Sequence, residues 1–326
     1  MLGRTAGARA GGCHGRYHPA MDFEVLPRDL AAYRAGNTGI DWVHRFDSGR
    51  PGPHVLVNAL THGNEFCGMV AACHLLDHGI RPRIGTLTVS FANVAAYQSF
   101  DPADPLASRQ LVHNLNRILG VEHLAGPDDS PELRRARELV PVVAAADHVL
   151  DIHSTSSDVQ PFWVYPQRAA NAAAALAIGR PAVHLVMPQG LGSGTPLIQH
   201  GRLAHPAYPG VALVAECGGH FRQASADLAV QVALDFLAHF GLVEPREPQR
   251  RPQQRYELVR TCVVRTPDWR FARPVVGFET FDGGELIATD GADEIRAPEG
   301  GCTILMPTRH PVPGREGVYL ARLLDA

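Results

Sequence analysis

The stretch His54-Val-Leu-Val-Asn-Ala-Leu-Thr-His-Gly-Asn-Glu65 decides the fold. Its first seven residues form a short apolar run between Pro53 and Thr61, which is typical of a strand buried on both faces. From Asn64 to His78 the apolar residues recur at helical spacing, which predicts a helix that stops near Gly79. A buried strand that turns directly into a helix is the building unit of an α/β sheet.

The same alternation of strands and helices continues from about residue 41 to residue 241. Further strands are expected at 86–93, 148–153, 162–165, 183–187 and 211–216, and helices at 130–146, 169–178 and 225–240. The fold class predicted is α/β, with a mixed, mostly parallel sheet flanked by helices.

The composition of the chain changes twice and so divides it. Residues 1–20 are rich in Gly, Ala and Arg and are expected to form a flexible leader before an α/β domain at 21–243. Residues 244–255 carry three prolines among charged side chains, which favours a linker. The short apolar runs that follow, broken by Gly, Pro and Asp, predict a small all-β, barrel-like domain at 256–326.

Composition excludes several classes of protein. The 326 residues are 45% apolar and 19% charged, and 30 basic residues, all arginine, against 33 acidic residues leave a net charge of −3. No basic field attracts nucleic acid or an anionic membrane, and no apolar run approaches the ~18 residues of a membrane span. The six cysteines form no CxxC pair and the N-terminus lacks the apolar core of a secretory signal, so we expect a reducing, cytoplasmic location.

Two predicted strands end in residues suited to a metal ion. His62 and Glu65 follow the first strand, and His153 ends the strand that begins at His148. Carboxyl ends of parallel strands share one edge of a sheet, and two imidazoles with one carboxylate describe a catalytic zinc site with an open fourth position. Taken alone, the first pair is equally a helix-start glutamate favoured by the helix dipole beside an incidental histidine. Asp151 is a candidate acceptor for His153, or a solvated carboxylate.

Candidate groups for catalysis and substrate binding lie in two other segments. Glu216 ends a third apolar strand and can act as a general base toward a water molecule. Arg109 can stabilise an oxyanion, whereas Asn116 and Arg117 can hold a substrate carboxylate; the alternative is that these arginines are ordinary surface residues.

Taken together, these motifs resemble the succinylglutamate desuccinylase/aspartoacylase family of the zinc-carboxypeptidase superfamily. The family's HGxE motif matches residues 62–65, its D-x-H segment matches His153, and its DLNR motif matches residues 114–117. Asn114 stands where the family has aspartate, so we expect one supporting contact to differ. By this resemblance His62, Glu65 and His153 hold one Zn²⁺ per chain, and Glu216 is the general base. The arginine eight residues before the DLNR arginine matches Arg109.

The resemblance implies a zinc-dependent deacylase that cleaves the amide bond of a small N-acyl amino acid or related carboxylated compound. In this reading Glu216 activates a zinc-bound water, Arg109 stabilises the oxyanion, and Asn116 and Arg117 bind the substrate. The expected partner is that small carboxylated molecule, with no nucleic acid or membrane; a homo-oligomer stays open. Two alternatives stay open as well: a metallocarboxypeptidase acting on short peptides, and a non-catalytic zinc-dependent binding protein.

Overall fold

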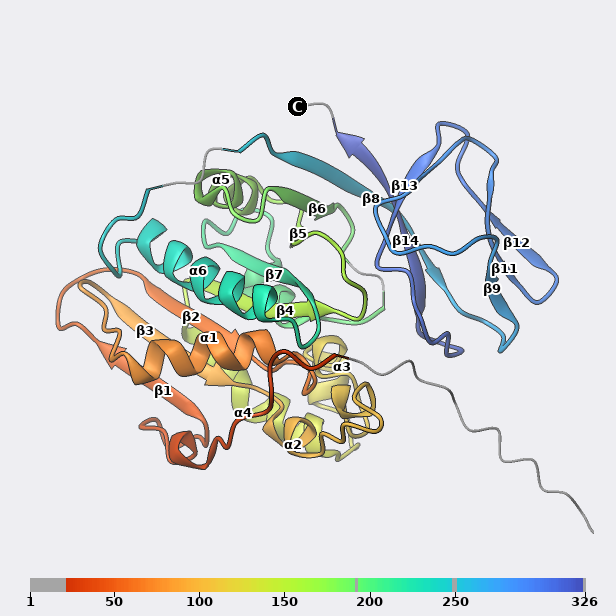
Figure 1. Cartoon of the computed structure of the whole chain (residues 1–326). Helices are drawn as coiled ribbons and strands as arrows, with labels where there is room; N and C mark the ends of the chain where they lie inside the picture. The colour runs from red at the N-terminus through yellow and green to blue at the C-terminus, as the bar shows by residue number, and fades with distance from the viewer. Residues whose placement is uncertain (1–21, 191–192, 248–250, 325–326) are drawn as a thin grey trace, which may run out of the picture.

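The computed structural model describes residues 22–190, 193–247 and 251–324, so the leader expected at 1–20 lies outside the described residues. One large sheet contains strands from both the N-terminal and the C-terminal parts of the described chain (Figure 1). Its eleven strands follow the spatial order β1 (Val43–Asp47), β3 (Thr86–Phe91), β2 (His54–Ala59), β4 (His148–Thr155), β7 (Ala212–Gly219), β5 (Phe162–Pro166), β6 (Val183–Met187), β8 (Gln254–Val263), β14 (Glu316–Leu324), β13 (Cys302–Leu305) and β10 (Thr280–Phe281).

The centre of the sheet is parallel. Strands β3, β2, β4 and β7 all run in one direction, and β5 pairs antiparallel with β7 before β6 and β8 resume parallel pairing. The mixed, mostly parallel α/β sheet predicted from the sequence is therefore confirmed. Because β2 and β4 are parallel neighbours, the residues that follow each of them emerge at the same edge of the sheet.

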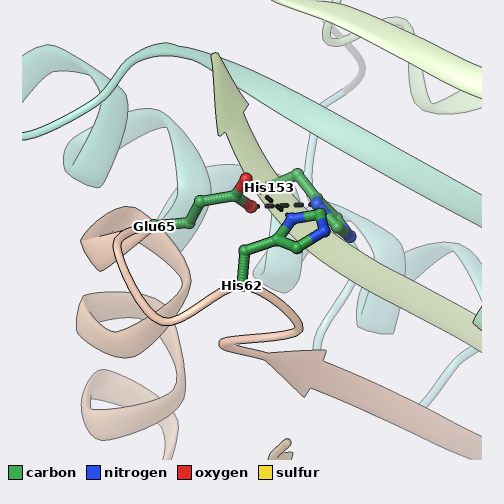
Figure 2. Close-up of side chains that lie close together, drawn as sticks. All are labelled: His62, Glu65 and His153. Atoms are coloured by element: carbon green, nitrogen blue, oxygen red, sulfur yellow. Dashed lines mark hydrogen bonds and ion pairs between the residues drawn. The ribbon is translucent and has the colours of Figure 1, made fainter. Parts of the chain in front are cut away.

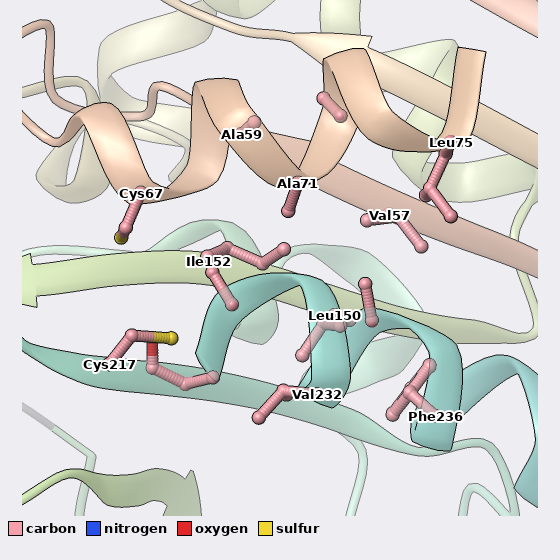
Figure 3. Packing of buried hydrophobic residues seen from close by; sticks show 14 of the residues in the cluster. Val57, Ala59, Cys67, Ala71, Leu75, Leu150, Ile152, Cys217, Val232 and Phe236 are labelled. Carbon is pink, nitrogen blue, oxygen red and sulfur yellow. The ribbon is translucent and has the colours of Figure 1, made fainter. Parts of the chain in front are cut away.

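One face of the sheet is covered by α1 (Phe66–Asp77), α5 (Ala169–Ile178) and α6 (Gln223–His239). Figure 1 shows α1 and α6 side by side, and Figure 3 shows their apolar side chains packed on those of β2 and β4. Both Cys67 and Cys73 are buried in α1. Helix α1 gives way to a left-handed residue at Gly79 (φ +59°), the conformation that glycine adopts most readily.

The opposite face is covered by α4 (Pro131–Ala145). Leu56 alternates with Val55 and Val57 along β2 and packs with Val143 of α4, whereas its two neighbours pack under α1 and α6. Ser130 caps α4 by accepting a hydrogen bond from the Leu133 amide at 3.1 Å. A central strand with apolar side chains on both faces is the expected core of such a sheet.

The C-terminal region is all-β, as predicted. Strand β8 pairs in parallel with β6 and antiparallel with β14, so the main sheet continues into this region without a break. A second sheet of three strands, in the order β12 (Asp293–Arg296), β11 (Leu286–Asp290) and β9 (Trp269–Phe271), completes it. Strand β8 begins at Gln254, inside the segment expected to be a linker; the division into domains stays a prediction.

Two further short helices, α2 (Val94–Gln98) and α3 (Val121–Leu124), lie in the connections between β3 and α4. Within the described ranges, none of the helices has the length and apolar character needed to cross a membrane.

Candidate metal centre

The tight turn after β2 brings His62 and Glu65 together. Leu60, which is buried, takes a left-handed conformation (φ +58°) that reverses the chain at the end of the strand. A Cβ on Gly63 would overlap the backbones of Tyr97 and Ser108, so only glycine allows this close approach. The Gly63 amide also donates to the Arg109 carbonyl at 3.1 Å, which holds the segment bearing Arg109 against the turn.

Three side chains converge at the edge of the sheet where β2 and β4 end (Figure 2). His62 Nδ1 lies 2.9 Å from Glu65 Oε1, and His153 Nδ1 lies 2.9 Å from Glu65 Oε2. One ligand atom from each residue falls within 4.8 Å of the others, and all three side chains are buried. Two imidazole nitrogens and a carboxylate so arranged can hold a divalent ion.

The far nitrogen of each imidazole already has an acceptor. His62 Nε2 lies 2.9 Å from Asn114 Oδ1, and His153 Nε2 lies 2.8 Å from Asp151 Oδ2. Asn114 Oδ1 also accepts from the Asn116 amide at 2.9 Å, so its oxygen, not its nitrogen, faces the ring. When each Nε2–H donates outward, both Nδ1 lone pairs face the centre, as a metal ligand requires.

Charge in the cluster favours a cation. Burial lowers the pKa of His62 to about 4, so its imidazole is neutral near pH 7. Burial also opposes the charges of Glu65 and His153. Interaction with His62 and with His153 nevertheless lowers the pKa of Glu65 well below its usual value. Interaction with Asp151 and with Glu65 raises the pKa of His153 well above its usual value. The negative charges of Glu65 and Asp151 are therefore stabilised by positive charge between the imidazoles, which a bound divalent ion would supply. The donor set fits Zn²⁺.

Glu216 lies beside this cluster. It is the direct neighbour of His153 in the pairing of β7 with β4, and its Oε2 is buried with no hydrogen-bond partner. Burial, with a further contribution from Glu65, raises the pKa of Glu216 to about 8 although His153 opposes the shift. A carboxyl group with such a pKa can both accept and return a proton near neutral pH.

All the predicted ligand, catalytic and substrate-binding residues line one cavity of about 390 Å³. Its walls include His62, Glu65, Arg109, Asn116, Arg117, His153 and Glu216. Arg109 Nη1 donates to Glu65 Oε1 at 3.1 Å, and Asn116 Oδ1 accepts from the Leu197 amide at 3.0 Å. Arg117 is engaged as well, because its guanidinium pairs with Glu316 of β14 at 2.8 Å.

Sequence reasoning missed several residues of the cavity. His220, four residues after Glu216, is buried at its wall, and Ser154 Oγ lies 2.7 Å from His220 Nδ1. A histidine so close to a predicted strand end was a usable signal. Part of the cavity wall is formed by residues of the C-terminal region between Met306 and Tyr319. The sequence could not predict this, because no sequence pattern connects these residues with the motifs around His62, His153 and Glu216.

The fold and the site together define an α/β protein with a buried histidine–glutamate–histidine cluster at the carboxyl edge of its parallel strands. Residues 51–240 match the family model of the succinylglutamate desuccinylase/aspartoacylase catalytic domain. The chain belongs to this family.

Related proteins agree with this assignment. A rat N-acyl-aromatic-L-amino acid amidohydrolase (carboxylate-forming) is 32% identical over 123 residues, which are 34% of this chain and 36% of that protein. The mouse protein of the same name is 34% identical over 116 residues, or 32% of this chain and 34% of its own. The matched segments thus span about a third of the curated relatives' length.

Solved structures share the fold over nearly the whole chain. The succinylglutamate desuccinylase of Vibrio cholerae superposes with a TM-score of 0.67 and 18% identity, covering 87% of this chain and 86% of that one. The corresponding protein of Chromobacterium violaceum has a TM-score of 0.65 and 19% identity, with 88% and 90% covered.

Proposed function

We propose that this protein is a zinc-dependent amidohydrolase that removes the acyl group from a small N-acyl amino acid. The observation that carries the proposal is the placement of Glu216, a carboxyl group with an unpartnered oxygen, beside the His62–Glu65–His153 cluster in one cavity. Membership of the family supports the assignment, as does the name of the rat and mouse relatives, N-acyl-aromatic-L-amino acid amidohydrolase.

His62, Glu65 and His153 would hold the ion through their inward-facing atoms. When bound, Zn²⁺ would polarise the amide carbonyl and make the attacking water more acidic. Glu216 takes the proton that this water loses and delivers it to the nitrogen of the leaving amine, which matches its raised pKa. Arg109 is about a third exposed and forms an ion pair with Glu65. We assign to it the stabilisation of negative charge on the carbonyl oxygen.

The residues that line the cavity around the metal cluster are proposed to bind the substrate. Asn116 and Arg117 are proposed to contact the substrate, and both line the cavity. Because Arg117 is paired with Glu316, a carboxylate that approached it would compete with a protein carboxylate. Arg309 and Arg315 line the same cavity, and among the described residues no carboxylate lies within 4 Å of either guanidinium. We assign the α-carboxylate of the substrate to these two arginines.

The test is a hydrolysis panel with the zinc-loaded protein. N-acetyl and N-succinyl amino acids are compared with dipeptides and simple esters, while metal content is measured by elemental analysis. The proposal expects turnover of N-acyl amino acids with one zinc per chain. Preferential cleavage of dipeptides would favour a metallocarboxypeptidase, and bound zinc without turnover of any compound would favour a binding protein.

The variant Glu216→Gln tests the role of Glu216 as the general base. This variant keeps a side chain of the same shape but cannot accept the proton, so turnover should fall by about 10²-fold or more. Zinc content and thermal unfolding should stay as in the wild type, because Glu216 is not among the three ligand residues. Near-normal turnover would show that another group activates the water.

A further inference from the structure

Glu132 is a buried carboxylate that takes no part in the proposed reaction steps. It lies in the first turn of α4 and is fully buried. Its Oε1 accepts from the Leu111 amide at 2.6 Å, and its Oε2 accepts from the His113 amide at 3.3 Å. The Val112 amide lies 3.4 and 3.3 Å from the two oxygens. Three successive backbone N–H groups therefore converge on one acceptor-only side chain.

The hydrogen bonds to Glu132 hold the segment 111–113 in place. Leu111 and Val112 are 44% and 56% exposed, so burial of apolar surface does not fix this segment. Within the described residues, the three amides have no hydrogen-bond acceptor other than Glu132. Without this carboxylate the amides would bond to water, and the backbone of the segment would gain freedom to move.

The segment joins two residues that contact the metal cluster. Arg109, two residues before it, donates from Nη1 to Glu65 Oε1 at 3.1 Å. Asn114, which follows it directly, faces His62 Nε2 with its Oδ1 at 2.9 Å. A shift of the segment would therefore move both side chains relative to the cluster. A displacement of about 1 Å in groups that position a reaction can cost about 10²-fold in rate.

Glu132 also contacts the residues after β3, which in turn support the metal-binding turn. Asn93 Nδ2 lies 3.4 Å from Glu132 Oε1, and the Asn93 amide donates to the Leu60 carbonyl at 2.8 Å. Leu60 is the left-handed residue at which the chain turns toward His62. One carboxylate thus links α4, the segment 111–113 and the turn that carries two of the three candidate ligands.

We propose that Glu132 is a positioning residue, which holds Arg109 and Asn114 against the metal cluster by anchoring the amides of residues 111–113. Glu132 is not among the residues that line the cavity, so it acts through the segment and not on a substrate. The anchoring is a property of the folded chain alone. Its consequence for turnover rests on the proposed function, in which Arg109 stabilises the oxyanion.

The residues proposed to bind the substrate have anchors of their own. Asn116 Oδ1 accepts from the Leu197 amide, and the Arg117 guanidinium pairs with Glu316. Loss of Glu132 should therefore leave KM within about twofold of the wild type and lower kcat, because it displaces a group that acts on the transition state.

Amide hydrogen exchange on the full chain, with zinc supplied, tests the anchoring without any turnover. The variant Glu132→Gln keeps the shape of the side chain but offers one acceptor oxygen in place of two. In this variant the amides of residues 111–113 should exchange about tenfold faster or more, while those of β2 and β4 exchange as in the wild type. Glu138→Gln, an exposed carboxylate on the same helix, is the matched control and should change neither rate.

A double-mutant cycle connects the anchoring with the reaction. At saturating zinc, Glu132→Gln should lower kcat about tenfold, which is part of the ~10²-fold that a displaced positioning group can cost. In protein that carries Arg109→Met, the same change should lower kcat by less than about twofold, because the side chain that Glu132 positions is already absent. A purely structural role of Glu132 would lower kcat equally in both backgrounds.

The outcomes separate this inference from the proposed function. Unchanged exchange of residues 111–113 in folded Glu132→Gln, or an equal fall of kcat in both backgrounds, would overturn the inference. If Glu132→Gln does not fold, Glu132→Asp, whose carboxylate is one methylene farther from the segment, takes its place in both experiments. Wild-type amides at 111–113 that exchange as fast as those of an unstructured peptide would also overturn it. If exchange behaves as expected while no N-acyl amino acid is hydrolysed, the proposed activity is wrong and Glu132 still anchors the segment.

Discussion

Asp151→Asn should weaken zinc binding without removing any of the three ligands. Asp151 is fully buried, and its Oδ2 accepts from His153 Nε2 at 2.8 Å. Its Oδ1 accepts from Asn58 Nδ2 and from Thr61 Oγ1, each at 2.8 Å. An asparagine has one acceptor oxygen, so its NH₂ group must face either the histidine or these two donors.

The size of the effect follows from these contacts. If the amide nitrogen faces His153, the imidazole loses the acceptor that holds Nε2–H outward and keeps the Nδ1 lone pair aimed at the centre. Loss of such a partner typically costs about 10- to 100-fold in metal affinity, which is about 1.4 to 2.7 kcal/mol. If the amide oxygen faces His153 instead, the ring keeps an acceptor without a negative charge, and the loss falls at the lower end of the range.

The assay is competition for Zn²⁺ with a chromophoric chelator at pH 7, with Asp268→Asn, an exposed residue, as the control. Urea unfolding of the metal-free proteins reports any separate loss of stability from the mismatched buried amide, on the order of 1 to 3 kcal/mol. Zinc affinity within twofold of the wild type in a folded Asp151→Asn protein would refute the orienting role of Asp151.

Further predictions concern the metal and the ion pair. His62→Ala and His153→Ala should each abolish stoichiometric zinc, measured by elemental analysis, because each removes one of three donors; full occupancy in both would contradict the ligand assignment. Asn114→Asp should tighten zinc binding by up to about tenfold, because a carboxylate makes the His62 ring a stronger ligand; unchanged or weaker competition with the chelator would argue against this contact. Glu316 has its pKa lowered to about 2 in the folded protein from an ordinary 4.5, so it contributes stability that is complete above about pH 5 and lost as the pH falls toward 2. This contribution is on the order of 3 kcal/mol, and the difference in unfolding free energy between wild type and Glu316→Gln should shrink between pH 7 and pH 3.5; a difference independent of pH would refute it.

The spacing of apolar residues along the chain was enough to predict the α/β core. The runs at 169–178 and 183–187 became α5 and β6 with those same bounds, because periodicity and local breakers act over a few residues. Strand β1 and strand β8 gave no such signal: β1 is only partly buried along its length, and β8 follows a charged, proline-rich stretch. Both strands are stabilised by pairing with partners far along the chain, which local periodicity does not record.

The residues of the candidate centre were also predictable, for a geometric reason. His62 and His153 each lie at or just beyond the end of a buried strand, and parallel pairing of β2 with β4 places such ends at one edge of the sheet. The same argument predicted Glu216, because β7 pairs in parallel with β4 and Glu216 lies near its end. The sequence by itself thus determined the central strands β2, β4 and β7 and the candidate ligand and base residues that meet at that edge.

Only the tertiary structure decided how those groups are paired. The sequence predicted that Arg117 holds a substrate carboxylate, and only the fold shows that Glu316 of β14 forms an ion pair with it. It also aims the Asn114 oxygen at His62 and buries His220 beside Ser154. Such contacts join segments separated by tens to hundreds of residues, and they depend on side-chain directions that the packing of the whole sheet imposes. Local sequence fixes which chemical groups are present, whereas long-range packing fixes which of them remain available to a substrate.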